Sequence, residues 1–357
     1  MNQRLQSIDI LRGLTVMLMI IVNSPGTWEH VAPPLRHSAW NGLTLTDVVF
    51  PCFMFIMGIT TYISMCKYGF RLSRQSALKM LRRTLVLFAL GLLINWTAAG
   101  LPGLHALRVP GVLQRFAVCY LAVSLASTVL KPRRMTVAAV FLLVAYAVLL
   151  VAGNGYAYDE SSLLSIVDRA CLGSNMMYDG GIDPEGILST IPSIAHVMVG
   201  YCAGAVLLSE RPLADRLLRL AKWGIAMLFA GLLADSWLPI NKKVWSPSFV
   251  LVTCGLSALA LVLLAVLLDV EKRRIPKTLF LVFGMNPLVC YVLGELLCVA
   301  LGAFRIYGIP LQEYFYWTFA SLLGDGMMAS FVTAVALDVI VGACGWAMYA
   351  RRIFVKI

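Results

Sequence analysis

Residues 135–153 read MTVAAVFLLVAYAVLLVAG, an apolar run without a single charged side chain. A helix needs about 20 apolar residues to cross the hydrocarbon core of a bilayer, so this run predicts a membrane-spanning helix. Similar runs recur along the whole chain. They predict spans at residues 8–25, 44–66, 84–100, 111–130, 135–153, 187–208, 223–239, 248–268, 279–303 and 327–350. The shorter apolar run at 313–324 predicts an interfacial or re-entrant helix.

The overall composition agrees with these spans. Of the 357 residues, 60% are hydrophobic and 13% are charged, whereas soluble domains are about 45–50% apolar and about 25% charged. We therefore expect an all-α polytopic membrane helix bundle of about 10 transmembrane helices, built as a single domain over residues 1–357. This composition excludes a soluble enzyme, a disordered chain and a nucleic-acid-binding protein. The nine cysteines form no CxxC pair, so they predict neither a disulfide framework nor a metal site.

The distribution of basic residues predicts the orientation and explains the net charge of +11. If the N-terminus is cytoplasmic, 21 of the 29 Lys and Arg residues fall in inner segments and six in outer segments. Cytoplasmic loops of membrane proteins carry this excess of positive charge. Because an even number of spans returns the chain to its starting side, both termini are expected to be cytoplasmic.

Charged residues inside spans need a reason, because each costs about 2.5–3.5 kcal/mol to insert. Asp9 and Arg12 lie on one face of the first span, where they could pair at its inner end. Their presence also argues against a cleavable signal peptide. His196, in the predicted sixth span, is expected to form a hydrogen bond between helices.

Two arginines stand seven residues apart around the start of the fourth predicted span. Arg108 and Arg115 would face the same way on a helix, because seven residues make two turns. Such a pair suits an anionic group or a buried carboxylate. Glu295 and Asp235 are the candidate partners.

Polar residues also gather at the predicted outer mouth of the bundle, in Arg36-His37-Ser38-Ala39-Trp40-Asn41-Gly42. An imidazole between an indole and an amide at this mouth suits a general base, although an inert interfacial histidine is the alternative. Thr44 and Asp47 have the spacing of a capping box, which competes with a chemical role for Asp47. Asn23, at the outer end of the first span, has a cap or turn as its structural alternative.

Six stretches of this sequence resemble the bacterial relatives of heparan-α-glucosaminide N-acetyltransferase, a family of transmembrane acyltransferases. They are RLQSIDILRGLTVMLMIIVN (4–23), RHSAWNGLTLTDVVFPCFMFIMG (36–58), LRVPGVLQRFAVCY (107–120), DPEGILSTIPSI (183–194), LPINKKVWSPSFV (238–250) and GMNPLVCY (284–291). The resemblance implies transfer of the acetyl group of cytosolic acetyl-CoA to the amine of an amino sugar, glucosamine or a terminal glucosamine, at the outer side. It implies a multi-pass protein in the lipid bilayer of a bacterial inner membrane. A homodimer is a candidate assembly that the sequence does not decide.

The resemblance also implies roles for individual residues. His37 would take part in acetyl transfer with Asn23 beside it, while Arg115 belongs to the family's Gly-Val-Leu-Gln-Arg run. Because CoA would enter from the cytoplasm and His37 lies near the outer face, the acetyl-pantetheine arm would have to cross a core about 30 Å thick. Arg115, Arg12 and Asp9 would line or brace its path. The other candidates are expected to contact substrate at the outer mouth: Trp40, Asn41, Asp47, Asp183, Glu185, Asn241 and Lys242.

Several functions remain open at this point. Direct transfer through a ternary complex would use His37 as base and the amide of Asn23 or Asn41 to stabilise the oxyanion. The alternative mechanism acetylates His37 first. An O-acyltransferase for an envelope glycan, a secondary transporter of sugars and a non-catalytic sugar or lipid receptor are the competing functions. We favour direct N-acetyl transfer, without a metal.

Overall fold

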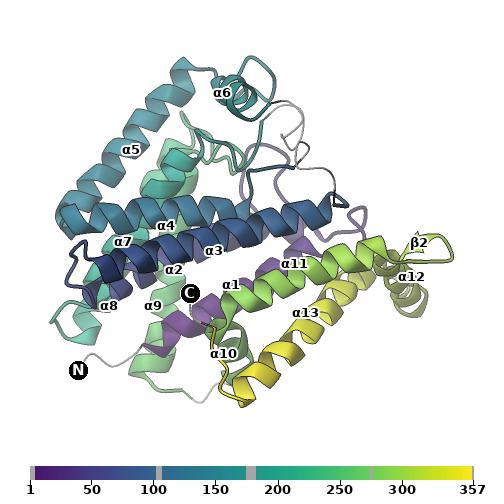
Figure 1. Cartoon of the computed structure of the whole chain (residues 1–357). Coiled ribbons are helices and arrows are strands. Elements are labelled where there is room, and N and C mark those ends of the chain that lie inside the picture. Colours follow the sequence, from purple (N-terminus) through teal and green to yellow (C-terminus); the bar gives the residue numbers. More distant parts are fainter. Residues whose placement is uncertain (1–4, 102–106, 174–181, 274–275, 356–357) are drawn as a thin grey trace.

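A computed structural model describes residues 5–101, 107–173, 182–273 and 276–355 (Figure 1). These residues are mostly helical, and their two short strands, β1 (Arg305–Ile306) and β2 (Ile309–Pro310), pair antiparallel as a small hairpin. The helices are α1 (Gln6–Asn23), η1 (Pro33–Leu35), α2 (Leu45–Cys66), α3 (Arg74–Ala98), α4 (Val112–Val129), α5 (Pro132–Ala152), α6 (Leu163–Leu172), α7 (Thr190–Leu207), α8 (Leu213–Ala234), α9 (Pro247–Ala265), η4 (Val266–Val270), α10 (Thr278–Met285), α11 (Pro287–Ala303), α12 (Leu311–Leu323) and α13 (Gly326–Ala350).

Eight helices in the described part of the chain are long and apolar enough to cross a membrane: α1, α2, α4, α5, α7, α8, α9 continued by η4, and α13. The pair α10 and α11 passes the same test as a ninth, bent span. The remaining predicted span lies in α3, whose first turns carry four Lys or Arg residues. The all-α polytopic membrane bundle is therefore confirmed, with eight or nine spans by length and composition where about 10 were expected.

The predicted span 279–303 is two helices. They meet at an angle of 87° between Met285 and Pro287. Proline has no N–H to continue the hydrogen bonding of α10, and its fixed φ suits the first turn of a new helix. The Asn-Pro pair therefore ends one helix and begins the next, which uninterrupted apolar composition could not reveal.

Two glycines bring α2 and α7 into backbone contact. A Cβ added at Gly58 would lie 2.3 Å from the carbonyl oxygen of Val197, and one at Gly200 would lie 2.2 Å from that of Phe55. Small residues allow this close approach between membrane helices. The contact fixes α2, whose first turn carries Asp47, against the centre of the bundle.

Both ends of the described chain lie at the same end of the bundle. The N–H of Gln6, at the start of α1, donates to the Asp269 carboxylate after α9 (2.9 Å). The N–H of Val355, beyond α13, donates to Oδ1 of Asn286 at the α10–α11 bend (2.9 Å), and α10 packs along α1. The two ends of the described chain therefore share one side, and its assignment to the cytoplasm stays a prediction.

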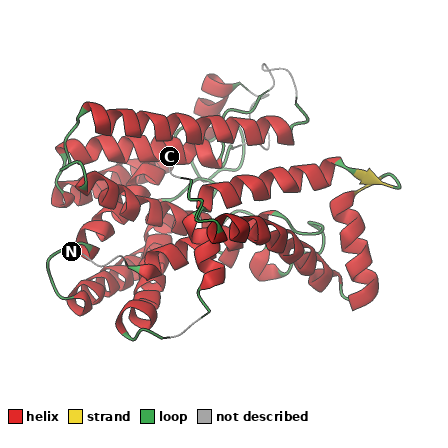
Figure 2. Ribbon diagram, turned by 60° about the horizontal axis from the view of Figure 1, so that its bottom comes forward, coloured by secondary structure: helices red, strands yellow, loops and turns green. Residues whose placement is uncertain are grey.

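At the opposite end, the segment after α1 packs against α12 and α13. Gln312 of α12 donates to the carbonyl of Pro25 (2.6 Å), and the N–H of Gly26 donates to the carbonyl of Ser330 in α13 (3.2 Å). Figure 2 shows the hairpin and the helix after it standing at the edge of the main bundle. The apolar run predicted at 313–324 is this short helix, α12.

Candidate active site

The segment between η1 and α2 brings His37 against the first turn of α2. Nδ1 of His37 lies 2.7 Å from Oδ1 of Asp47. The Asp47 side chain is almost completely buried, at 1% exposed, whereas 41% of the His37 side chain is exposed. Because a carboxylate only accepts hydrogen bonds, we assign the proton of neutral His37 to Nδ1. This leaves Nε2 of an accessible ring with its lone pair.

The second oxygen of Asp47 forms the predicted capping box. Oδ2 accepts hydrogen bonds from the N–H and the hydroxyl of Thr44 (3.2 and 2.9 Å) and from the N–H of Ser38 (3.1 Å). The capping interaction at Thr44 and Asp47 is confirmed. One carboxylate therefore holds the start of α2, the backbone beside His37 and the imidazole ring.

Lys242 joins this pair from the loop between α8 and α9. Its Nζ lies 3.4 Å from Oδ1 of Asp47 and 3.2 Å from Nδ1 of His37. Because an ammonium only donates and Nδ1 carries the ring proton, Lys242 pairs with the Asp47 carboxylate and not with the ring. Burial lowers the pKa of the Lys242 ammonium, and the charge of the Asp47 carboxylate opposes this effect. Sequence reasoning had placed all three residues at the outer mouth, and the structure brings them together.

The same loop docks against the Trp40-Asn41-Gly42 turn. Nδ2 of Asn241 donates to Oδ1 of Asn41 (3.0 Å), and Oδ1 of the buried Asn241 accepts from the N–H of Val244 (3.1 Å). The N–H of Gly42 donates to the carbonyl of Ile240 (2.7 Å). Since the Asn41 oxygen is used as an acceptor, the NH₂ group is the part of this amide left to donate.

Trp40 ties the turn to the segment after α5. Its indole N–H donates to the carbonyl of Tyr156 (3.0 Å), and its ring packs on that of Tyr158, with 4.6 Å between the centroids. Lys243 lies over the Tyr158 ring at 4.5 Å. These contacts hold the candidate Trp40 in place, close to the other candidate residues of this site.

A second charged cluster joins the start of α4 to the Asp-Pro-Glu-Gly segment. Arg108 donates through Nε and Nη2 to the two oxygens of Asp183 (3.2 and 2.7 Å) and through Nη2 to Glu185 (2.8 Å). The Asp183 side chain is fully buried. A forked contact of this kind is the strong form of an ion pair.

Replacing Arg108 by methionine should destabilise the protein, because the buried carboxylate of Asp183 would lose its counter-charge. Breaking such a pair from one side costs about 3–5 kcal/mol. We expect a clear fall in the melting temperature of the purified protein. The double variant Arg108→Met/Asp183→Asn should recover part of that loss, and a double variant no more stable than Arg108→Met would contradict the expectation.

Arg115 lies deeper, in the first turn of α4, and is buried. Its Nη2 donates to the carbonyl of Gly186 (3.3 Å) and to the hydroxyl of Ser189, and its guanidinium lies over the Trp245 ring at 5.1 Å. Its Nε and Nη1 form no hydrogen bond with the described residues. Buried polar groups without a partner are rare, so we expect a polar ligand or a water molecule to bind next to these two nitrogen atoms.

The interpretation of the two arginines as one helical face is wrong. The α4 helix begins at Val112, so Arg108 lies in the preceding loop. Both side chains nevertheless reach the same Asp-Pro-Glu-Gly segment. The partners proposed for them are also wrong, because Glu295 accepts from Asn23 and Asp235 accepts from a backbone N–H in its own loop.

Three other candidates pair with residues outside the His37 cluster. Asn23, at the end of α1, donates to Oε1 of Glu295 in α11 (3.0 Å) and is not among the described residues that hydrogen bond to His37. Arg12 pairs with Asp9 (3.0 Å) as expected and also donates to the carbonyl of Gly284 (3.2 Å). This ion pair therefore lies near the α10–α11 bend, at the end of the bundle that holds the termini.

Sequence reasoning missed Trp245, which connects the loop between α8 and α9 to the interior of the bundle. Its ring is almost fully buried and packs edge-on against His196, with 6.0 Å between the centroids. Within the described chain, the Trp245 indole nitrogen forms no hydrogen bond. His196 of α7 instead contacts the backbone of Pro51 in α2, in agreement with the hydrogen bond between helices expected for it. Trp245 lies in the quoted stretch 238–250, but a tryptophan in an apolar run gives no signal of its own.

Asp168 of α6 was also missed. Its Oδ1 accepts from the N–H of Ile187 (2.8 Å), beside the Asp-Pro-Glu-Gly segment. Burial raises the pKa of the Asp168 carboxyl to about 6, although the bond from Ile187 opposes the shift. A carboxyl whose pKa is raised by folding binds its proton more tightly in the native state than in the unfolded state. Ionised Asp168 therefore destabilises the folded protein, and this loss of stability is absent below about pH 4 and complete above about pH 6.

Asp168→Asn should therefore stabilise the protein at pH 7.5, since the amide oxygen can still accept from Ile187. We expect a gain on the order of 1–2 kcal/mol that shrinks as the pH falls from 6 to 4. Melting temperatures of both proteins across this range measure the effect. A difference that grows toward low pH would have the wrong sign.

These features define a polytopic membrane protein with a buried carboxylate, an exposed imidazole and an ammonium at the mouth of its helical bundle. A family model described as heparan-alpha-glucosaminide N-acetyltransferase, catalytic, matches residues 4–240. The chain belongs to this family.

Two curated relatives extend the match over most of the chain. The heparan-alpha-glucosaminide N-acetyltransferase of Mus musculus is 29% identical over an alignment of 358 positions. This alignment covers 82% of this chain and 54% of the mouse protein. The Homo sapiens protein of the same name is 29% identical over 356 residues, covering 81% of this chain and 52% of its own length. The chain thus spans about half the length of the curated relatives it matches.

Proposed function

We propose that this protein is a transmembrane acetyltransferase. It would move the acetyl group of cytosolic acetyl-CoA to the amine of an amino sugar, glucosamine or a terminal glucosamine, at the outer side of a bacterial inner membrane. Family membership supports the reaction class. The observation that carries the proposal is the contact between buried Asp47 and Nδ1 of exposed His37 (2.7 Å), because it leaves Nε2 as a base.

In this mechanism the unprotonated amine attacks the thioester carbonyl. As the new C–N bond forms, the nitrogen loses a proton to Nε2 of His37, and Asp47 stabilises the imidazolium through Nδ1–H. The tetrahedral intermediate then collapses, its C–S bond breaks, and the thiolate takes the proton from His37. The products are the N-acetyl sugar and CoA with a free thiol, and His37 returns to its neutral form.

The developing oxyanion would need a hydrogen-bond donor. We propose the Asn41 NH₂ group for this role, because the Asn41 oxygen is already an acceptor for Asn241. Asn23 is the alternative donor, since one N–H of its NH₂ group donates to Glu295 and the other is left to bind the oxyanion. One such donor is typically worth about 2.7–4 kcal/mol. Lys242, next to both His37 and Asp47, would add a positive charge near the same oxygen.

The acetyl-pantetheine arm of the donor would run past Arg115, Trp245 and His196. Arg115 and His196 both contact Trp245, and buried nitrogen atoms of Arg115 and Trp245 form no hydrogen bond with the described residues. The amide groups of the arm could provide partners for them. Asp9 and Arg12, at the other end of the bundle, would brace the entry of the arm.

Arg115→Ala should consequently weaken acetyl-CoA binding at least about tenfold, as the loss of one charge-assisted contact implies. The chemically closer Arg115→Lys should retain more affinity. Titration calorimetry with acetyl-CoA measures both variants. Unchanged binding and turnover in Arg115→Ala would remove this residue from the donor path.

The reaction itself is tested with purified protein, labelled acetyl-CoA and a panel of sugars. We expect label in glucosamine and in oligosaccharides with a terminal glucosamine, and none in N-acetylglucosamine, whose amine is blocked. An ester-linked product, cleaved by hydroxylamine, would instead identify an O-acyltransferase. Labelled product from none of the sugars, together with no binding of acetyl-CoA, would contradict the proposal and favour a transporter or receptor.

A further inference from the structure

A separate cavity lies between the α1–α2 segment and α12. Its volume is about 400 Å³, and residues 25–30 form one wall while Gln312, Glu313, Tyr316 and Trp317 form another. Small-molecule sites are typically about 300–1,000 Å³. His37 and its neighbours do not line this cavity, so it is distinct from the candidate active site.

The cavity offers large aromatic surfaces. Trp28 is 59% exposed and Trp317 is 55% exposed, whereas Tyr316 between the two walls is buried. Exposed indole rings that line a cavity can stack on flat apolar surfaces. The apolar C–H face of a sugar ring is such a surface, and its hydroxyls suit the polar groups around it.

The charges on the walls are acidic. Glu29 and Glu313 line the cavity, and none of the described lining residues is a lysine or an arginine, although the chain as a whole has a net charge of +11. The Trp317 indole N–H donates to the Glu313 carboxylate (3.4 Å), which places a negative charge at the edge of an aromatic ring. A cationic ammonium fits this combination, whereas a phosphate or sulfate would be repelled.

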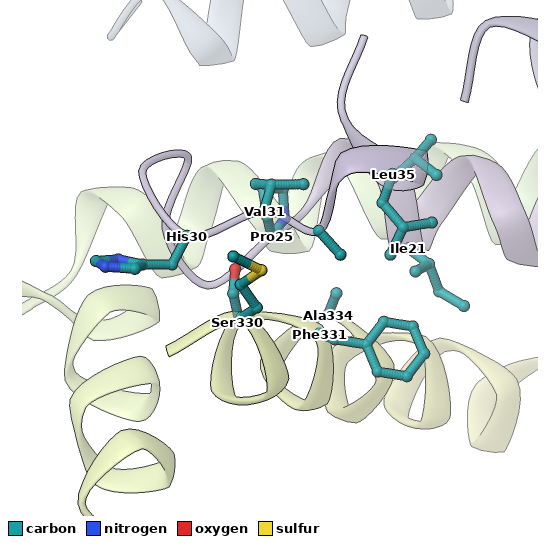
Figure 3. A pocket seen from close by; sticks show the side chains of 11 residues that line it. Ile21, Pro25, His30, Val31, Leu35, Ser330, Phe331 and Ala334 are labelled. Atoms are coloured by element: carbon teal, nitrogen blue, oxygen red, sulfur yellow. The ribbon is translucent and has the colours of Figure 1, made fainter. Parts of the chain in front are cut away.

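The walls are tied together across the cavity. The Tyr316 hydroxyl lies 3.0 Å from Nδ1 of His30, and the two rings stack with 5.8 Å between centroids. Gln312 donates to the carbonyl of Pro25 (2.6 Å). These contacts hold the two walls in place, so the cavity is preformed. Figure 3 shows a separate apolar niche on the same segment, with the His30 ring pointing away from Ile21. The volume of this niche is only about 10 Å³.

We propose that this cavity is a carbohydrate subsite that binds an oligosaccharide with free amino groups. The aromatic rings would stack on a sugar ring, and Glu29 and Glu313 would bind its ammonium. His30 and His37 are seven positions apart in the sequence, so their Cα atoms are at most about 25 Å apart. The subsite rests on the proposed function in one respect: it would hold units of the acceptor chain beyond the one that reacts at His37.

Binding can be tested without the acetyl donor. The probe is a fluorescently labelled tetrasaccharide of glucosamine, titrated by anisotropy with the full-length protein in detergent. The fully N-acetylated tetrasaccharide should bind at least about tenfold more weakly, because it has no ammonium. Unlabelled phosphoethanolamine, an ammonium with a phosphate, should not displace the probe.

Two variants localise the probe, with a matched control. Trp317→Ala should weaken binding of the glucosamine tetrasaccharide about tenfold, and Glu29→Gln/Glu313→Gln should abolish the preference over the N-acetylated form. Trp346→Ala removes a tryptophan that is similarly exposed near the end of α13, and should bind like the wild type.

Several results would overturn the subsite. They are no binding by the wild type, equal affinity for both tetrasaccharides, displacement by phosphoethanolamine, or an equal loss in Trp346→Ala and Trp317→Ala. Because the assay measures binding alone, absence of acetyl transfer would contradict the proposed function and leave the subsite standing.

Discussion

His37→Ala is expected to lower the rate of acetyl transfer by a factor of about 10²–10⁴, the usual contribution of a positioned general base. The loss should fall on the chemical step. Lys242 would still balance the charge of Asp47, and the backbone bonds of Asp47 would still hold the start of α2. The rate is measured with labelled acetyl-CoA and glucosamine, and acetyl-CoA binding is measured in parallel.

Added imidazole provides the control for this variant. The His37 side chain is 41% exposed, so a small base should enter the space it leaves and restore part of the rate, more at pH 8 than at pH 6. Donor affinity and melting temperature should stay close to those of the wild type. Full turnover by His37→Ala without added base would exclude His37 from the mechanism.

Asp47→Asn should lower the rate by about 10³–10⁴, as the equivalent change does in catalytic triads. The asparagine oxygen can replace the carboxylate oxygen that accepts from Thr44 and Ser38. Its NH₂ group would then face Nδ1 of His37, which would have to accept a hydrogen bond. The ring proton moves to Nε2, and the atom that should receive the proton of the amine already carries one. The kcat of the purified variant measures this effect.

Thr44→Val is the matched control for Asp47→Asn. It removes the hydroxyl bond to Asp47 and should cost about 0.5–2 kcal/mol of stability, as the loss of a helix cap does. It leaves the carboxylate and the His37 tautomer in place. A loss of rate in Thr44→Val as large as in Asp47→Asn would mean that the carboxylate acts through the fold alone.

Apolar run length predicted most of the bundle, because the hydrocarbon core sets one physical scale for every span. It could not predict the bend at Pro287, since that depends on one missing N–H within a run that stays apolar on both sides. It also placed the start of α8 about ten residues late. The basic segment there is amphipathic, and Leu217 and Leu220 bury their side chains on the side that packs against α9.

The capping interaction in the site was predictable from spacing, because Thr44 and Asp47 are three residues apart. The spacing did not predict that Asp47 also contacts His37, ten residues earlier. Contacts between distant segments were beyond local patterns, so the partners of Arg108 and the position of Trp245 had to come from packing. A spacing of seven residues places two side chains on one face only within a helix. Arg108 precedes the start of α4, so the rule does not apply to it.

The glycine contact between α2 and α7 sets the spacing between these two helices. Val197 and Phe55 present carbonyl oxygens where any Cβ at Gly58 or Gly200 would clash, so an alanine at either position would force the helices apart. The base at one end of α2 would then shift relative to the aromatic interior beside α7.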